Sequence, residues 1–160
     1  MFAVDSNIAL DVLEGPDETA HRSAALLQTL SHRGALIACG IVWAELAGRR
    51  EGPEIESALT ALRITVDWAL DKSVFEFAVR AWRHYLERRE QGGRSFVCPH
   101  CHRGVGVWEC PYCGLSVPPP RHLMSDFLIG GHAEARGLSL ITRDRGIYQR
   151  YFPDLALIQP

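Results

Sequence analysis

The sequence predicts an α/β domain of three layers, in which helices cover a mostly parallel central sheet, plus a small cysteine-rich insertion. Three observations support this fold class. Short apolar runs of strand length alternate with longer amphipathic segments, which is typical of a parallel sheet with helical connections. The 160 residues suit one domain with a small insert. Between residues 92 and 121 the alternation stops, and that stretch contains four of the five cysteines.

The first half of the chain is expected to contain three buried strands with helices between them. Apolar residues run together at 2–4, 35–39 and 64–66, and these segments are the predicted strands. Ser6 or Asn7 is expected to cap the first helix, which Gly15 and Pro16 end. Four more helices are predicted: one opened by Asp17 and Glu18, one over 41–46, one from Pro53 to about Arg63, and one from about Asp71 to Glu90.

After the insertion the alternation of helix and strand resumes. The pattern predicts a helix from about Met124 to Arg136, a strand over 138–142, a short helix around Tyr148 and a last strand over 155–158. The domain is therefore expected to consist of residues 1–91 and 122–160. Residues 92–121 form the insertion.

Composition excludes several classes of protein. A formal net charge of −2 and a pI near 6.4 exclude a histone-like polycation, so any binding of nucleic acid depends on local charge. No segment approaches 18 consecutive apolar residues, and the start of the chain lacks the basic region of a secretory signal. We therefore expect a cytoplasmic protein with no membrane contact. Thiols stay reduced in that compartment, so the cysteines are expected to bind metal or to lie in the core.

Four carboxylates are expected to meet at one edge of the sheet. Asp5 ends the first strand, Asp144 follows the strand over 138–142, Glu45 lies in the helix after the second strand, and Asp126 begins the helix after the insertion. Ligands of open α/β sheets bind outside the carboxyl ends of the strands. Clustered carboxylates repel one another unless a cation lies between them, and oxygen ligands select Mg²⁺ or Mn²⁺. Each acid taken alone is better explained as a helix cap or a surface charge, whereas the four together favour a site; others, such as Asp11, are expected to be solvated.

Several stretches of the chain resemble PIN-domain proteins, specifically VapC-type toxin ribonucleases. They are VDSNIALDVLEG (4–15), VWAELAG (42–48), SDFLIGGHAEARGLSLITRD (125–144) and YFPDLALI (151–158). The resemblance implies a PIN-like fold and a metal-dependent endoribonuclease whose four acids match Asp5, Glu45, Asp126 and Asp144. It also implies that Ser6, Asn7 and Thr142 support the metal site. A homodimer and a cognate antitoxin that blocks the acidic site are further implications of the resemblance.

Arginines near the predicted site are candidates for binding RNA. Arg143 and Arg145 flank Asp144 and are suited to hold the scissile phosphate, although they are equally well explained as surface residues. Arg83, Arg88 and Arg89 lie toward the end of the long helix, next to the insertion. We expect them to form part of an RNA-binding rim.

The cysteines of the insertion have the spacing of a structural metal site. Cys98 and Cys101 form one CxxC pair, and Cys110 and Cys113 form a second pair, with eight residues between the two pairs. Four thiolates close a tetrahedral shell, which indicates structural Zn²⁺, with iron as the chief alternative. The insertion either contacts RNA, serves as a folding staple or contacts a protein. Cys39 is expected to lie in the core.

Two alternatives to a toxin nuclease remain open on the sequence. One is a PIN endonuclease that matures ribosomal RNA, since some of these also contain a zinc ribbon. The other is a zinc-containing module that binds protein or RNA and does not catalyse. The complete set of four acids favours an enzyme over the binding module.

Overall fold

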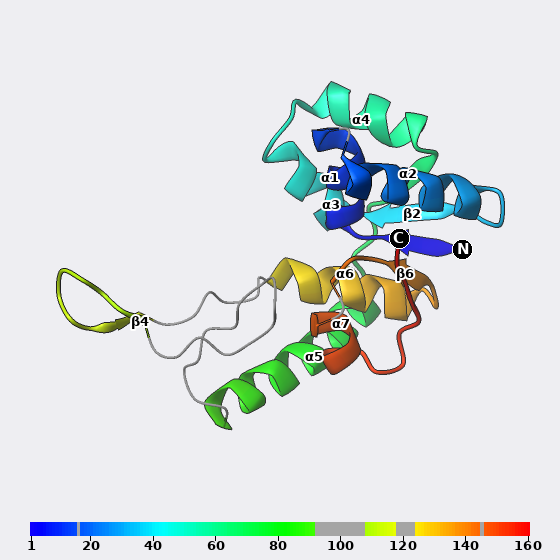
Figure 1. Ribbon diagram of the computed structural model, residues 1–160. Coiled ribbons are helices and arrows are strands. Elements are labelled where there is room, and N and C mark those ends of the chain that lie inside the picture. The colour runs from blue at the N-terminus through cyan, green and yellow to red at the C-terminus, as the bar shows by residue number, and fades with distance from the viewer. Residues whose placement is uncertain (16, 92–107, 118–123, 145) are drawn as a thin grey trace.

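A single parallel sheet organises the domain (Figure 1). The structure, a computed structural model, describes residues 1–15, 17–91, 108–117, 124–144 and 146–160. Its five strands are β1 (Phe2–Val4), β2 (Leu36–Cys39), β3 (Ile64–Asp67), β6 (Ser139–Ile141) and β7 (Leu157–Ile158), in the order β3-β2-β1-β6-β7. Every neighbouring pair is parallel, so all five carboxyl ends meet at the same edge. The predicted α/β fold is confirmed.

Helices cover both faces of this sheet. The connections are α1 (Ser6–Glu14), α2 (Glu18–Ser31), α3 (Gly40–Ala47), α4 (Gly52–Ala61), α5 (Lys72–Gln91), α6 (Met124–Ala135) and α7 (Gly146–Tyr151). Figure 1 shows α1 to α4 on one side of the strands and α5, α6 and α7 on the other. None of the described helices combines the length and apolar character that a membrane span requires.

The central strand brings the start and the end of the chain together. The register pairs Phe2 of β1 with Leu36 of β2 on one side and with Ser139 of β6 on the other. These short strands are almost completely buried; Val4, Leu36 and Leu140 are each 1% exposed or less. Burial on both faces explains why the sequence shows apolar runs here rather than alternation.

Helix α6 packs closely on α5 because it contains two adjacent glycines. A Cβ atom on Gly131 would lie 2.6 Å from the backbone oxygen of Val74, and one on Gly130 would lie 2.6 Å from the ring of Phe152. The next residue, the buried His132, is bonded through Nε2 to Asp67 Oδ2 at 3.0 Å, at the end of β3. The C-terminal half of α6 is therefore held against both α5 and the sheet. These contacts position the helix whose first turn contains Asp126.

One detail differs from the sequence analysis. The residue that caps α1 is Asp5 and not Ser6 or Asn7, and its side chain makes no capping hydrogen bond, because it points to other partners described below. Within the insertion, β4 (Trp108–Glu109) and β5 (Ser116–Val117) form an antiparallel hairpin that includes the second cysteine pair. Cys98 and Cys101 lie outside the described residues.

Candidate active site

Asp5 lies at the carboxyl end of the central strand and is almost fully buried, with 3% of its surface exposed. Its backbone amide donates to the Ile141 carbonyl at 3.0 Å, which ties it to β6. Its Oδ2 atom accepts hydrogen bonds from Thr142 Oγ1 at 2.6 Å and from Asn7 Nδ2 at 2.7 Å. Ser6 Oγ approaches Oδ1 at 3.4 Å. One carboxylate oxygen therefore accepts two short side-chain hydrogen bonds, whereas the side-chain contact of the other is long, and the Ser6 amide also bonds to this carboxyl group.

Thr142 joins the two ends of the chain through a single buried hydroxyl. Besides donating to Asp5, Thr142 Oγ1 accepts from Asn7 Nδ2 at 3.1 Å and from the backbone amide of Asp144 at 3.0 Å. Asn7 Oδ1 in turn accepts from the amide of Arg143 at 3.1 Å. A hydroxyl can donate one hydrogen bond and accept two, so the hydrogen-bonding capacity of the Thr142 hydroxyl is filled. Asn7 and Thr142 therefore hold the acids in place and keep little capacity to bind a ligand directly.

Asp144 caps helix α7. Its Oδ1 atom accepts from the amide of Gly146 at 2.8 Å and from that of Ile147 at 3.2 Å. Such a cap satisfies amide groups that have no partner within the helix. Among the described residues, both of these hydrogen bonds go to Oδ1 of Asp144. Oδ2 is therefore the oxygen better able to bind a cation.

Glu45 and Asp126 come from helices on opposite sides of the sheet. Glu45 lies in α3, which starts directly after β2, and Asp126 lies in the first turn of α6; both are partly exposed. Their charges act on the same buried groups. Glu45 and Asp144 raise the pKa of Asp5, and all four acids raise that of the Tyr148 phenol. The charges of the four acids expected from the sequence therefore act on one buried phenol, that of Tyr148.

Burial and repulsion determine the protonation of Asp5. Burial raises its pKa to about 6, although the hydrogen bond from Thr142 lowers it, and the charges of Glu45 and Asp144 raise it further. A carboxyl group in these surroundings is destabilised when it ionises, and a bound cation removes that penalty. The all-oxygen donor set suits a hard ion such as Mg²⁺ or Mn²⁺. Across the described residues, however, no three acid, histidine or cysteine side chains are already gathered to hold a metal ion.

Arg143 is already paired, and its partner is an acid that the sequence analysis misjudged. Arg143 Nη2 lies 2.7 Å from Asp11 Oδ1, and Ser23 Oγ donates to Asp11 Oδ2 at 2.7 Å. The Asp11 side chain is 7% exposed, so the expectation that it is solvated was wrong. Arg145 lies outside the described residues.

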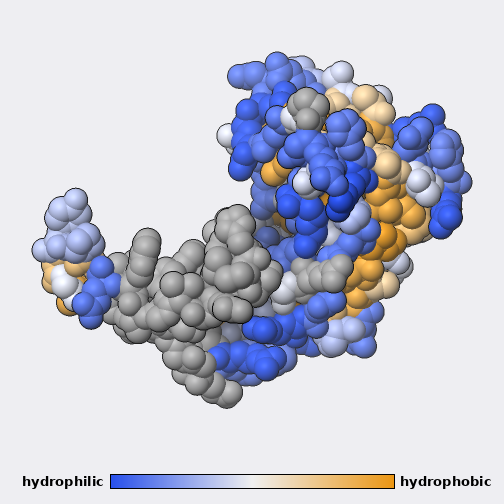
Figure 2. Space-filling view, viewed as in Figure 1, coloured by the Kyte–Doolittle hydropathy of each residue, from blue (hydrophilic) through white to orange (hydrophobic). Residues whose placement is uncertain are grey.

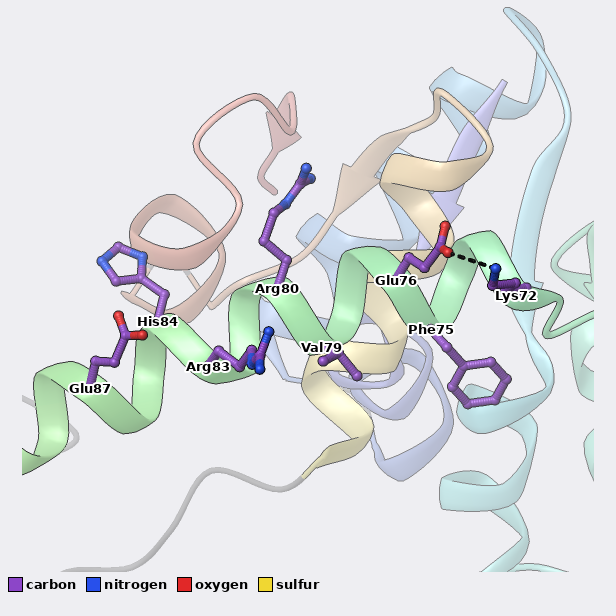
Figure 3. A pocket seen from close by; sticks show the side chains of 8 residues that line it. All are labelled: Lys72, Phe75, Glu76, Val79, Arg80, Arg83, His84 and Glu87. Atoms are coloured by element: carbon purple, nitrogen blue, oxygen red, sulfur yellow. Dashed lines mark ion pairs between the residues drawn. The ribbon is translucent and has the colours of Figure 1, made fainter.

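The arginines of α5 lie on a surface separate from the acids. An open groove of about 620 Å³ runs along α5. Figure 3 shows its lining side chains, among them Phe75, Val79, Arg80 and Arg83. None of the four acids lines it. Arg83 and Arg88 are exposed, and the side chain of Arg89 is not among those the structure describes.

The second cysteine pair lies in the turn of the β4–β5 hairpin. The amide of Cys110 donates to the Leu115 carbonyl at 2.8 Å, and that of Gly114 donates to the Cys110 carbonyl at 2.9 Å. Gly114 has a φ of 68°, which favours glycine. Backbone amides of Tyr112 and Cys113 bond to the Cys110 sulfur and lower its pKa, which favours the thiolate that a metal binds. Cys39, by contrast, is buried in the core as predicted.

Sequence reasoning did not find Tyr148. This residue is 1% exposed, and among the described residues its hydroxyl has no hydrogen-bond partner. It was recognised only as part of a short helix, because an apolar pattern does not distinguish a core ring from one whose polar end faces a site. A tyrosine one helical turn after a strand-end acid is the signal that was available.

Comparisons with known proteins agree with this geometry. A family model of the PIN domain matches residues 2–153. VapBC-1 from nontypeable Haemophilus influenzae is 17% identical with a TM-score of 0.61, over 99% of this chain and 96% of that one. VapBC2 from Rickettsia felis, solved bound to a promoter DNA fragment, is 16% identical with a TM-score of 0.59, over 99% and 97%. FitAcB from Neisseria gonorrhoeae is 18% identical with a TM-score of 0.59, over 99% and 96%.

The search of curated proteins found no match. At 16 to 18% identity the solved structures establish a shared fold. The family match spans most of the chain and includes all four acids. The chain therefore belongs to the PIN-domain family, whose members are nucleases.

Proposed function

We propose that this protein is a divalent-metal-dependent endoribonuclease and the toxin of a toxin–antitoxin pair. The observation that carries the proposal is the carboxyl group of Asp5, which is 3% exposed at the carboxyl edge of the sheet and is acted on by the charges of Glu45 and Asp144. Such a concentration of negative charge is unfavourable in a buried place unless a cation binds there. Its oxygen donors are those that Mg²⁺ and Mn²⁺ prefer.

Each acid has a definable part in this reaction. Asp5 Oδ1 and Asp144 Oδ2 are the carboxylate oxygens best able to hold the cation, and Glu45 and Asp126 complete the oxygen shell. Ser6, Asn7 and Thr142 keep the acids in place. When bound, the cation supplies a positive charge that neutralises the phosphate and activates a water. In-line attack of water on the phosphorus would then break its bond to the 3′ oxygen and leave a 5′-phosphate and a 3′-hydroxyl.

Cleavage of labelled RNA by the purified chain tests this proposal. We expect no cleavage after chelation of metals, and recovery with Mn²⁺ or Mg²⁺. The Asp126→Asn variant should lose about a thousandfold or more in rate while keeping its fold, because it removes one ligand charge. Glu56→Gln is the matched control, since Glu56 is an exposed acid on α4. Equal rates for Asp126→Asn and Glu56→Gln would contradict the proposal.

The toxin assignment is supported by the kind of structure that shares this fold. VapBC2, VapBC-1 and FitAcB all match over nearly the whole chain. We therefore propose a cognate antitoxin that covers the acidic site, and action in the cytoplasm, where RNA is available. Co-expression with a short neighbouring reading frame should relieve growth arrest. Relief of growth arrest by the neighbouring protein would exclude the alternative of a ribosomal-RNA maturation enzyme. Failure of the purified protein to cleave RNA would favour the alternative of a non-catalytic binding module.

RNA contacts and a homodimer are further parts of the proposal. We propose that Arg83, Arg88 and Arg89, together with Arg145, contact phosphates; Arg143 does so only if it leaves Asp11. Replacing Arg83, Arg88 and Arg89 with alanine should then weaken RNA binding and lower its salt slope by about two to three. Phe75 and Val79 on α5 are 46% and 43% exposed, which supports a dimer contact on this helix. Sedimentation tests the dimer.

The insertion is proposed to be a structural zinc site formed by Cys98, Cys101, Cys110 and Cys113. The hairpin supports it, because the amides around Cys110 favour a thiolate and the turn places Cys113 three residues later. Metal analysis of protein purified without chelators distinguishes zinc from iron.

A further inference from the structure

Arg143 is the residue between Thr142 and Asp144, and helix α1 holds both its backbone and its side chain. The Nη2 atom of Arg143 lies 2.7 Å from Asp11 Oδ1, and its backbone amide donates to Asn7 Oδ1 at 3.1 Å. Asn7 and Asp11 are four residues apart in α1 and therefore share one face of the helix. One face of α1 thus holds the segment that joins Thr142 to Asp144 at two points.

The acid that pairs with Arg143 is buried and is fixed in turn by a second helix. The side chain of Asp11 is 7% exposed, whereas that of Arg143 is 47% exposed. Ser23 of α2, which is fully buried, donates to Asp11 Oδ2 at 2.7 Å. Both carboxylate oxygens of Asp11 are therefore engaged, one by the guanidinium and the other by a hydroxyl. A buried carboxylate needs such partners, so Asp11 cannot turn to another group without a large loss of stability.

The other ion pairs of the described residues have more exposed acids. In each of them the acid side chain is at least 14% exposed, the lowest value being that of Glu134 beside Arg80. Ion pairs surrounded by solvent contribute little, because both side chains stay free to move. Asp11 is held on both oxygens, so its pair with Arg143 fixes the position of the arginine.

The segment that this ion pair holds supplies two groups of the acidic site. Thr142 Oγ1 donates to Asp5 Oδ2 at 2.6 Å, and the amide of Asp144 donates to Thr142 Oγ1 at 3.0 Å. Arg143 lies between these two residues, so a movement of its backbone moves both of them. The distance between the carboxyl groups of Asp5 and Asp144 therefore depends on where Arg143 is held.

We propose that Asp11 is a positioning residue of the proposed metal site: through its ion pair with Arg143 it fixes the segment that leads to Asp144, and so sets the distance between the Asp5 and Asp144 carboxyl groups. This inference rests on the proposed function. Arg143 then acts inside the protein as the link between α1 and this segment, and its guanidinium is not the group that binds the RNA phosphate.

A double-mutant cycle on the ion pair tests the inference. Asp11→Asn keeps the size of the side chain and removes its charge, and Arg143→Ala removes the partner. Each variant should weaken Mn²⁺ binding to the RNA-free protein by about tenfold in calorimetry, as is typical of residues behind metal ligands. The double variant should be no weaker than either single variant, because Asp11 acts only through Arg143. Glu134→Gln, which removes the charge of the acid paired with Arg80, is the matched control and should bind Mn²⁺ as the wild type does.

RNA binding in the presence of a chelator separates this role from that of a phosphate ligand. The Kd of Arg143→Ala for RNA should stay within about twofold of the wild type, with an unchanged salt slope. A weaker Kd with a salt slope lower by about one would overturn the inference, because Arg143 would then bind a phosphate. Wild-type Mn²⁺ affinity in Asp11→Asn would also overturn it, as would additive losses in the double variant.

A general loss of stability needs its own control. Ile55→Val removes one methylene group from a fully buried residue of α4, and should lower the melting temperature while leaving Mn²⁺ affinity unchanged. If Ile55→Val weakened Mn²⁺ binding as much as Asp11→Asn does, the ion pair would have only a structural role and the inference would fail.

Two further measurements keep the outcome clear. If Arg143→Ala does not fold, Arg143→Lys replaces it in the cycle; it keeps a cation opposite Asp11, and its Mn²⁺ affinity should lie within about threefold of the wild type. A loss in Arg143→Lys as large as that in Asp11→Asn would overturn the inference. Wild-type protein that binds Mn²⁺ but cleaves no RNA would contradict the proposed function alone, whereas wild-type protein that binds no Mn²⁺ would contradict both.

Discussion

The acidic site and the cysteine hairpin are built in opposite ways. Asp5 is 3% exposed and is held by side chains from both ends of the chain, Asn7 two residues away and Thr142 137 residues away. The hairpin turn has Tyr112 at 96% and Leu115 at 71% exposure. One region is positioned by a packed core, and the other has no core of its own among the described residues.

This difference shows where the stability of each region originates. In the acidic site the fold forms first and places carboxylates where they repel, so a cation binds to a frame that already exists. In the hairpin two strands of two residues cannot fold alone. There, metal binding would itself supply the folding free energy, as in small zinc domains. In Figure 2 the broad hydrophobic band lies on the sheet domain, whereas the hairpin shows a small area of mixed hydrophilic and hydrophobic surface.

The largest effect on the free energy of unfolding is expected from Thr142→Val, which removes the hydroxyl that holds the acidic site together. Valine preserves shape but leaves Asp5, Asn7 and the amide of Asp144 without their shared partner. We expect a loss of about 3 kcal/mol in the free energy of unfolding. Urea titration measures it. The control Thr60→Val removes a hydroxyl bonded only to the Glu56 carbonyl on an exposed helix, and should change stability by less than about 0.5 kcal/mol. Similar losses of stability in Thr142→Val and Thr60→Val would show that the hydrogen bonds of Thr142 do not stabilise the acidic site before a cation binds.

A smaller effect, an increase in the free energy of unfolding, is expected from Asp5→Asn in metal-free protein above the pKa of Asp5. The pKa of Asp5 is raised from 3.8 to about 6, so between these values the folded state binds more protons than the unfolded chain. Stability should therefore fall as pH rises from about 4 to 6, and Asp5→Asn should lack this component. At pH 7.5 the variant should be more stable than the wild type by about 2 kcal/mol.

Urea unfolding at pH 4.5 and 7.5 with a chelator measures this difference, and added Mn²⁺ should stabilise only the wild type. A variant that is less stable than the wild type at pH 7.5 would show that the hydrogen bonds to Asp5 outweigh its repulsion.

The smallest effect on the sheet domain is expected from Cys110→Ser with Cys113→Ser. Bound zinc should fall from one equivalent to none by elemental analysis, and amide protection of the hairpin should disappear. The melting temperature of the domain should change by less than about 1 °C, because this turn is exposed. Cys39→Ala should show the reverse, with zinc retained and the melting temperature lowered by a cavity in β2. A large loss of stability in the double variant would show that the two regions fold as one.

The sheet and the four acids were predictable because each depends on local signals. An apolar run followed by Asp5, or by Thr142 and Asp144, predicts a strand that ends at the ligand edge, and parallel topology then brings these ends together. The cysteine spacing likewise predicts a metal site from neighbouring residues alone.

Features that depend on side-chain direction were not predictable in this way. Asp11 occupies a position on α1 that looks solvent-exposed in the sequence, yet it is buried between Arg143 and Ser23, which come from other elements. Asp5 was expected to follow a strand, but not to turn away from the helix it precedes and to bond to Thr142. Such contacts join residues far apart in the chain, and periodicity contains no information about them.

The central place of β1 has a consequence for the order in which the protein is made. One neighbour of β1, the strand β2, follows it closely in the sequence, whereas the other neighbour, β6, is synthesised much later. Asp5 can accept the hydrogen bond from Thr142, and feel the charge of Asp144, only when the residues that follow β6 have been synthesised. A chain whose synthesis has not reached β6 therefore has an incomplete acidic site.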